Sequence, residues 1–176
     1  MPAKPIVLAL VTFFHDLFTV AWLGGLFTLA LVVLPTALGV WGRGPETRRL
    51  MDGIQRRLSP IVYVSIVGLA ITGALLARRN PAYGGLLSFA NPYTTIVSIK
   101  HLLMLAMAAV ALLRSVALRA APSVRLTMIG AGAGAPALSI RERLMGALLY
   151  LNLFFGLLVL LLSGISVAIG TRVPPV

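Results

Sequence analysis

The chain has 176 residues, of which 59% are hydrophobic and 11% charged, and its formal net charge is +11. Soluble domains carry about 25% charged residues, so this composition excludes an ordinary water-soluble domain and calls for lipid as a solvent. The lack of cysteine excludes disulfides, thiolate metal sites and covalent c-type haem attachment. Because no polar domain is present to carry nucleic-acid binding, we interpret the positive charge as a signal of membrane topology.

Four long apolar segments predict four transmembrane helices. A helix needs about 20 apolar residues to cross the hydrocarbon core of a bilayer, and the segments at about 5–40, 60–77, 92–113 and 144–169 meet this length. None alternates as a β-strand would, and isolated hairpins leave backbone groups unsatisfied in lipid. The predicted fold is therefore all-α, a single-domain polytopic bundle of four transmembrane helices. We expect the first segment to be retained, because it lacks a signal-peptide cleavage pattern.

Local signals predict where some of these helices begin. Ser59 precedes Pro60 and Asn91 precedes Pro92, which puts a capping side chain before a proline at the first helical position. The segment 45–58 has leucine and isoleucine on one helical face and arginine on the other. It predicts a short amphipathic helix that lies on the membrane surface in the first cytoplasmic connection.

The basic residues are distributed unevenly between the two sides of the predicted bundle. Ten belong to the first and third connections, and four lie on the side of the termini and the second connection. Basic residues favour the cytoplasmic side, so we predict both termini to be extracytoplasmic, in a multi-pass protein of the inner (plasma) membrane. The ten are Arg43, Arg48, Arg49, Arg56, Arg57, Arg114, Arg119, Arg125, Arg141 and Arg143; the four are Lys4, Arg78, Arg79 and Arg172.

Four ionisable residues lie inside the predicted spans: His15, Asp16, Lys100 and His101. Each costs roughly 2.5–3.5 kcal/mol on insertion scales, and intramembrane charges usually mark function. The first and third spans run in the same direction, and the histidines lie ten residues past Pro5 and nine past Pro92. At about 1.5 Å per residue the two histidines reach nearly the same depth. We therefore predict that the two imidazoles face one another in the extracytoplasmic half of the bundle.

Two imidazoles on separate helices at one level suit axial ligation of a haem b iron in a bundle core. Imidazole also binds copper and zinc, and Met104, one turn from His101, offers a thioether to copper. Asp16 and Lys100 then orient the imidazoles or meet haem propionates. The alternative is structural: the histidines bond to backbone carbonyls, and Asp16 and Lys100 form an ion pair.

One face of the first span adds candidate cofactor contacts. Trp22 lies on the same helical face as His15, and Gly24 with Gly25 makes a flat patch that a macrocycle or a partner helix can approach closely. In the fourth span, Tyr150 and Asn152 are polar residues that we expect to form interhelical hydrogen bonds. No serine, histidine and carboxylate set is present for a hydrolytic site.

Short motifs in these spans resemble a known family. His15-x6-Trp22-x-Gly24-Gly25, Gly68-x4-Gly73 and Tyr93-x6-Lys100 look like motifs of CopD-like membrane proteins and of the related-looking HemJ-type protoporphyrinogen oxidases. The resemblance covers about residues 10–115. The CopD-like pattern implies a polytopic bundle linked to copper uptake or resistance. The HemJ-like pattern implies a four-helix haem b protein in which a first-span histidine and a third-span lysine matter, and His15 and Lys100 match those positions.

These observations lead to three functional hypotheses. The first is a b-type membrane cytochrome that exchanges electrons with a quinone or a membrane redox partner, with His15 and His101 as iron ligands. The second is a CopD-like copper-binding or transport protein using the same histidines and Met104. The third is a structural accessory subunit of a larger membrane complex or a homo-oligomer, in which the polar residues only fix helix packing.

Overall fold

The computed structural model describes residues 3–119 and 140–170, and every regular element in those ranges is helical. Four helices are long and apolar enough to cross a membrane, which confirms the predicted all-α, four-span architecture. The first span is built from α1 (Ala3–Thr19), η1 (Val20–Gly24), α2 (Gly25–Phe27), η2 (Thr28–Val33) and α3 (Leu34–Trp41). The other spans are α4 (Pro45–Ala77), α5 (Pro92–Arg119) and α6 (Ile140–Gly170).

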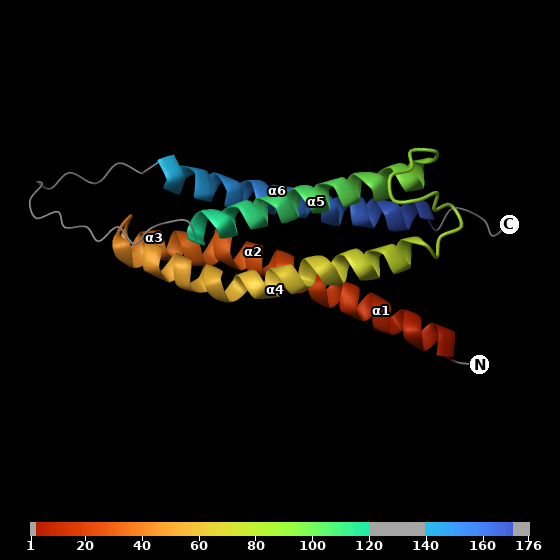
Figure 1. The fold of residues 1–176 in the computed structure, drawn as a ribbon, viewed down its shortest axis with the longest axis horizontal. Coiled ribbons are helices and arrows are strands. Elements are labelled where there is room, and N and C mark those ends of the chain that lie inside the picture. The colour runs from red at the N-terminus through yellow and green to blue at the C-terminus, as the bar shows by residue number, and fades with distance from the viewer. Residues whose placement is uncertain (1–2, 120–139, 171–176) are drawn as a thin grey trace, which may run out of the picture.

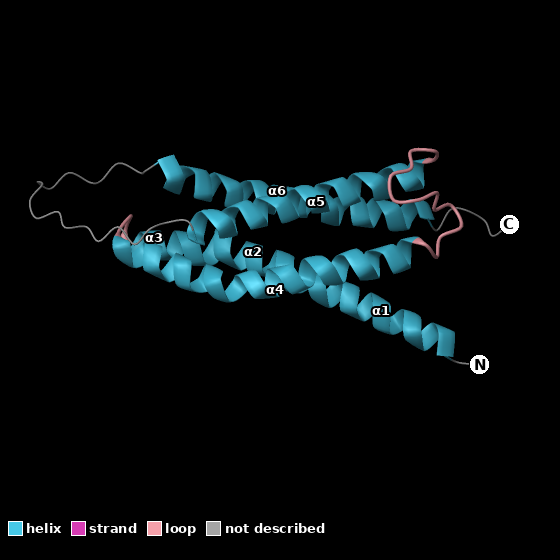
Figure 2. Ribbon diagram, in the orientation of Figure 1, coloured by secondary structure: helices cyan, strands magenta, loops and turns pink. Residues whose placement is uncertain are grey.

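The helices form two adjacent antiparallel pairs (Figures 1 and 2). The first span packs mainly on α4, and α5 packs mainly on α6. The two pairs meet where α2 and η2 contact α6 and where α4 contacts α5, so the middle of the first span lies at the centre of the bundle. The start of α1 and the end of α6 lie at the same end of the molecule (Figure 1), as four crossings require.

The core is concentrated around the middle of the first span, where the backbone departs from regular α-helix. The segments η1 and η2 are π-helical, with wider turns that alter the direction of successive side chains. Neighbouring residues therefore both reach the interior, as Trp22 does with Leu23 and Leu29 with Ala30, all at most 6% exposed. Gly156 of α6 leaves space for the Leu23 side chain, because a Cβ at this glycine would overlap that side chain.

The first part of α4 differs from the sequence-based expectation. The segment 45–58 is helical, but it continues directly into the second span instead of forming a separate surface helix. Pro60 lies inside α4, so the prediction that it begins a helix is wrong. The Ser59 hydroxyl donates to the Gln55 carbonyl at 2.8 Å and supports the turn ahead of the proline, rather than capping a new helix.

The predicted start of the third span is confirmed. Asn91 accepts a hydrogen bond from the Thr94 backbone N–H at 2.8 Å, so it caps α5 with Pro92 as the first helical residue. Its side-chain amide also donates to the Ala82 carbonyl at 2.9 Å. The cap thereby ties the connection between α4 and α5 to the helix start.

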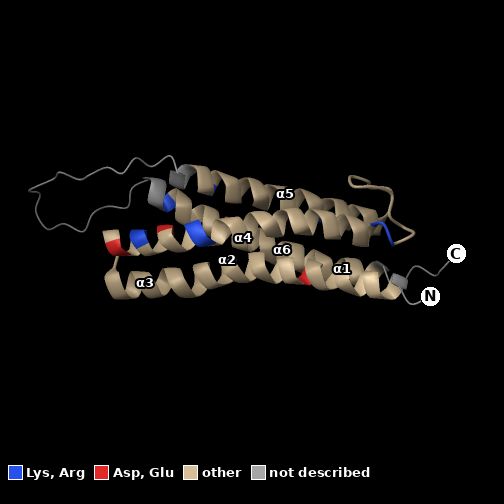
Figure 3. Ribbon diagram, turned by 60° about the horizontal axis from the view of Figure 1, so that its bottom comes forward, with Lys and Arg blue, Asp and Glu red and all other residues tan. Residues whose placement is uncertain are grey.

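Most of the charged residues drawn in Figure 3 lie at one end of the bundle, and a smaller basic group, Arg78 and Arg79, follows α4 at the other end. We call the more highly charged end the basic end; it contains the turn between α3 and α4, the start of α4, the later part of α5 and the start of α6. Arg114 was counted as a loop residue from the sequence, but it lies within the third span, which extends to Val116 rather than Leu113. The side chains of Lys4, Arg119, Arg125, Arg141 and Arg172 lie outside the described residues.

Candidate functional site

The four polar residues predicted inside the membrane have different surroundings. His15 is half-buried on α1 and faces α4, where its Nδ1 lies 2.9 Å from the Thr72 hydroxyl. Lys100 and His101 are half-buried on α5, and Asp16 is exposed. The carboxylate of Asp16 forms no ion pair with any cation of the described residues, so the predicted ion pair with Lys100 is not formed.

The hydrogen bonds of Thr72 favour one tautomer of His15. A threonine hydroxyl has a single proton, and Thr72 donates it to the Gly68 carbonyl at 2.7 Å. With its proton on the Gly68 carbonyl, Thr72 Oγ1 accepts from His15 Nδ1, which then carries the ring proton. In the neutral imidazole, this leaves the lone pair on Nε2.

His101 reaches the same tautomer with a different partner. Its Nδ1 lies 2.7 Å from the backbone carbonyl of Val97, one turn earlier on α5. A carbonyl only accepts, so Nδ1 donates and Nε2 keeps its lone pair. Histidines that bind metals usually donate their other ring N–H in this way, so both imidazoles have the tautomer that a metal ligand needs.

Two glycines of α4 shape the surface on which α1 packs. A Cβ at Gly73 would lie 3.6 Å from His15 Cε1, and a Cβ at Gly68 would overlap the Phe18 ring. Gly68 therefore lets the helices approach closely, and Gly73 leaves room beside the imidazole. The Gly68-x4-Gly73 motif thus helps to set the position of His15 against α4. Thr72, between these glycines, was missed from sequence, although a polar residue in an apolar span was a signal.

The two histidines do not share a hydrogen bond in the described part of the chain, because each Nδ1 is engaged by its own partner. Lys100 nevertheless lies within electrostatic range of the His15 imidazole. The main neighbour of α1 is α4, and the common depth of His15 and His101 stays a prediction. Met104 is half-buried one turn from His101 and packs against the core.

The remaining candidate residues of the first span are part of the packing. Trp22 is 2% exposed. A Cβ at Gly25 would lie 3.6 Å from the Leu58 side chain of α4, whereas one at Gly24 would meet only Val20 of its own helix. At Gly25 the small residue therefore serves an approach between helices, which favours the packing interpretation of this pair over a macrocycle surface.

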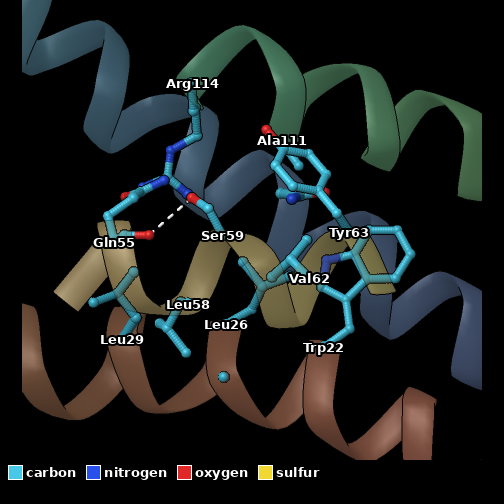
Figure 4. Close-up of a pocket in the computed structure, with 12 residues that line it drawn as sticks. Trp22, Leu26, Leu29, Gln55, Leu58, Ser59, Val62, Tyr63, Ala111 and Arg114 are labelled. Carbon is cyan, nitrogen blue, oxygen red and sulfur yellow. Dashed lines mark hydrogen bonds between the residues drawn. The ribbon is translucent and has the colours of Figure 1, made fainter. Parts of the chain in front are cut away.

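A small cavity lies between the first span, α4, α5 and α6 (Figure 4). Its volume is about 40 Å³, and its wall includes Trp22, Gln55, Tyr63, Arg114 and Asn152. Three of its buried polar atoms have no hydrogen-bond partner within the described residues: Trp22 Nε1, Arg114 Nε and Asn152 Oδ1. The cavity thus combines two N–H donors and one acceptor in an apolar setting.

The predicted interhelical roles of the fourth-span polar residues are met in part. The Tyr150 hydroxyl donates to the Ala30 carbonyl at 3.4 Å, which links α6 to the first span. The ring itself is 47% exposed rather than buried. Asn152 is 1% exposed, as expected for a core polar group.

Protein-family models, curated proteins and solved structures all give no match. The resemblance to CopD-like and HemJ-type proteins therefore stays a prediction from the short motifs.

The donor set limits what the site can hold. Among the described residues, no three side chains of His, Cys, Asp or Glu gather into a metal-binding group, whereas structural zinc sites use four such ligands and catalytic zinc sites three. The two imidazoles provide one nitrogen donor on α1 and one on α5. A haem iron, held by its porphyrin in one plane, needs only axial ligands from the protein.

Proposed function

We propose that the protein is an integral membrane haem b protein that transfers electrons to or from a quinone or a membrane redox partner. The observation that supports this proposal is the matched tautomer of its only two histidines, each with Nδ1 donating and Nε2 available. Their helices, α1 and α5, cross the bundle in the same direction, and the proposal requires the two imidazoles to lie at a common depth. The two imidazoles would supply the nitrogen donors that hold the haem iron.

In this proposal, His15 and His101 hold the group through Nε2, while Thr72 and the Val97 carbonyl fix the ring orientations. A bound haem b supplies a one-electron iron couple. The surrounding helices exclude water, and Lys100 adds a positive charge. Because a nearby cation favours the less positive oxidation state, Lys100 raises the reduction potential of the site.

Visible spectroscopy and haem analysis of the purified protein test the proposal. Protein from haem-replete cells should show a Soret band and, after reduction, an α-band, with one haem per chain. His15→Ala and His101→Ala should each lose this six-coordinate spectrum, whereas Thr12→Ala, an exposed position on α1, should keep it. A colourless wild-type protein, or an unchanged wild-type spectrum in both histidine variants, would overturn the proposal.

A CopD-like copper protein is the second candidate, supported by the position of Met104. This thioether lies three residues after His101 on the same side of α5, and its half-buried setting suits Cu(I). Elemental analysis separates the two candidates: one copper per chain without haem absorbance, lost in Met104→Leu, favours copper. Intact protein that binds neither copper nor haem favours the structural accessory role.

We also propose that the basic end faces the cytoplasm of a cell with an inner membrane. Seven arginines with described side chains belong to this end, among them Arg43, Arg114 and Arg143, and basic residues favour the cytoplasmic side. In this orientation, the histidines lie in the extracytoplasmic half. The short motifs support the further proposal that the protein is CopD-like or HemJ-like. Haem binding would favour the HemJ-like alternative.

A further inference from the structure

A second and much larger cavity lies at the basic end, away from the histidines. Its volume is about 650 Å³, and α3, α4, α5 and α6 all contribute to its wall. Pockets of about 300–1,000 Å³ are typical of sites for small molecules. Arg114, which lines it, follows His101 by thirteen residues on α5, about 20 Å along the helix axis. The cavity is therefore separate from the proposed haem site.

The charge of this cavity is strongly positive. Among the described residues, four arginines and one carboxylate, that of Asp52, line it. The arginines come from separate parts of the chain, since Arg43 and Arg48 flank the start of α4, Arg114 belongs to α5 and Arg143 to α6. Cations from three helices thus converge on one space, and the complementary ligand is an anion.

Arg114 is the observation that points to a ligand. Its side chain is 6% exposed, and its one hydrogen bond in the described part of the chain goes from Nη2 to Gln55 Oε1 at 2.8 Å. Its Nε is buried without a partner there, and both residues also line the small cavity of Figure 4. Gln55 is neutral, so the guanidinium keeps its full charge in an apolar bundle. Such a charge is costly unless an anion compensates it.

The walls of the cavity are suited to an apolar group beside the anion. Leu34 and Leu38 on one side and Met145 and Leu149 on the other line it between the arginines. A small inorganic anion would leave these side chains without a partner. An amphiphile places its charged group on the arginines and its apolar chain along the leucines, continuous with the surrounding lipid.

We propose that this cavity binds the headgroup of an anionic phospholipid, with Arg114 as its deepest cation and Arg43 and Arg143 at its margin. The phosphate supplies charge-assisted acceptors to the guanidinium groups, and the acyl chains leave the cavity beside Leu34 and Leu38. The site does not depend on haem binding, and it gives this end of the bundle a specific lipid contact beyond general charge attraction.

Thermal unfolding of the purified full-length protein in neutral detergent tests the proposal. Three additions are compared: phosphatidylglycerol, phosphatidylcholine and inorganic phosphate. At about 100 times the Kd, phosphatidylglycerol should raise Tm by roughly 5–10 °C, whereas phosphatidylcholine and inorganic phosphate should have little effect. The double variant Arg43→Gln with Arg143→Gln should lose at least half of this shift. Both positions are exposed, so the variant folds without disturbing the core.

Arg57→Gln is the matched control, because Arg57 is an exposed arginine of α4 that does not line the cavity. It should keep the full shift. Arg114→Gln should abolish it, and the double variant keeps the test valid if Arg114→Gln fails to fold. An equal shift with phosphatidylcholine, an equal shift with inorganic phosphate, or an undiminished shift in the double variant would each overturn the proposal. Haem content, measured on the same samples, should be unchanged in the double variant.

Discussion

Thr72→Val removes the hydroxyl that holds His15, while it keeps the size and shape of the side chain. Thr72 Oγ1 accepts from His15 Nδ1 at 2.9 Å and donates to the Gly68 carbonyl at 2.7 Å. Valine can do neither. The imidazole then loses the partner that fixes both its orientation and its tautomer, although the imidazole itself and its Nε2 remain.

The size of the effect follows from the burial of this bond. Thr72 is 8% exposed, so water has little access to replace the hydroxyl. A buried donor left without an acceptor costs about 1–3 kcal/mol. Loss of an outer partner of a metal-binding histidine typically costs 10–100-fold in metal affinity, which corresponds to about 1.4–2.8 kcal/mol. We therefore expect haem affinity to fall by roughly 10–100-fold.

The measurement is the transfer of haem from the purified variant to an excess of a haem-scavenging protein, followed by the loss of the Soret band. Thr72→Ser is the matched variant, because serine keeps the hydroxyl on the same backbone position. It should bind haem nearly as tightly as the wild type. If Thr72→Val released haem at the wild-type rate, or if Thr72→Ser released it as fast as Thr72→Val, the assignment of this hydroxyl to the orientation of His15 would be wrong.

Three further predictions concern packing, capping and topology. Gly68→Ala puts a Cβ into the Phe18 ring and should destabilise the protein by about 1–3 kcal/mol in an SDS unfolding titration. Asn91→Ala removes the cap of α5 and should cost about 0.5–2 kcal/mol in the same titration. Because the chain has no cysteine, single cysteines at Ser88 and Gly53 report topology: an impermeant thiol reagent added to whole cells should label only Ser88→Cys.

Each of these predictions has a control. Gly164→Ala adds a Cβ where nothing lies within 4 Å, so it should leave stability unchanged. If Gly68→Ala is as stable as Gly164→Ala, the inference that Gly68 allows close approach of α1 and α4 at Phe18 is wrong. Asn91→Asp keeps the acceptor oxygen and should retain most of the stability that Asn91→Ala loses. Labelling of Gly53→Cys in intact cells, with Ser88→Cys protected, would indicate the opposite orientation to the one proposed.

The spans and the start of α5 could be predicted from the sequence because the signals are local. Runs of apolar residues mark the helices, and Asn91 before Pro92 caps a helix through its own neighbour Thr94.

The contacts between helices could not be predicted from the sequence. Thr72 is 57 residues from His15, and Gln55 is 59 residues from Arg114. Nothing in either segment states which helices are neighbours. Arg114 was assigned to a loop because a charge in lipid is costly, and only the burial of its guanidinium beside Gln55 shows why it remains in the span. Pro60 was taken as a helix start because its ring disrupts helix interiors, yet α4 continues through it.

The central claim is that the Nε2 atoms of His15 and His101 bind one haem iron. Electron–nuclear double resonance on the oxidised protein, purified from cells fed ¹⁵N-labelled histidine, measures this directly. We predict a low-spin ferric signal coupled to two histidine nitrogens, reduced to one in His15→Ala and in His101→Ala. A wild-type signal coupled to one labelled nitrogen or to none would contradict the claim.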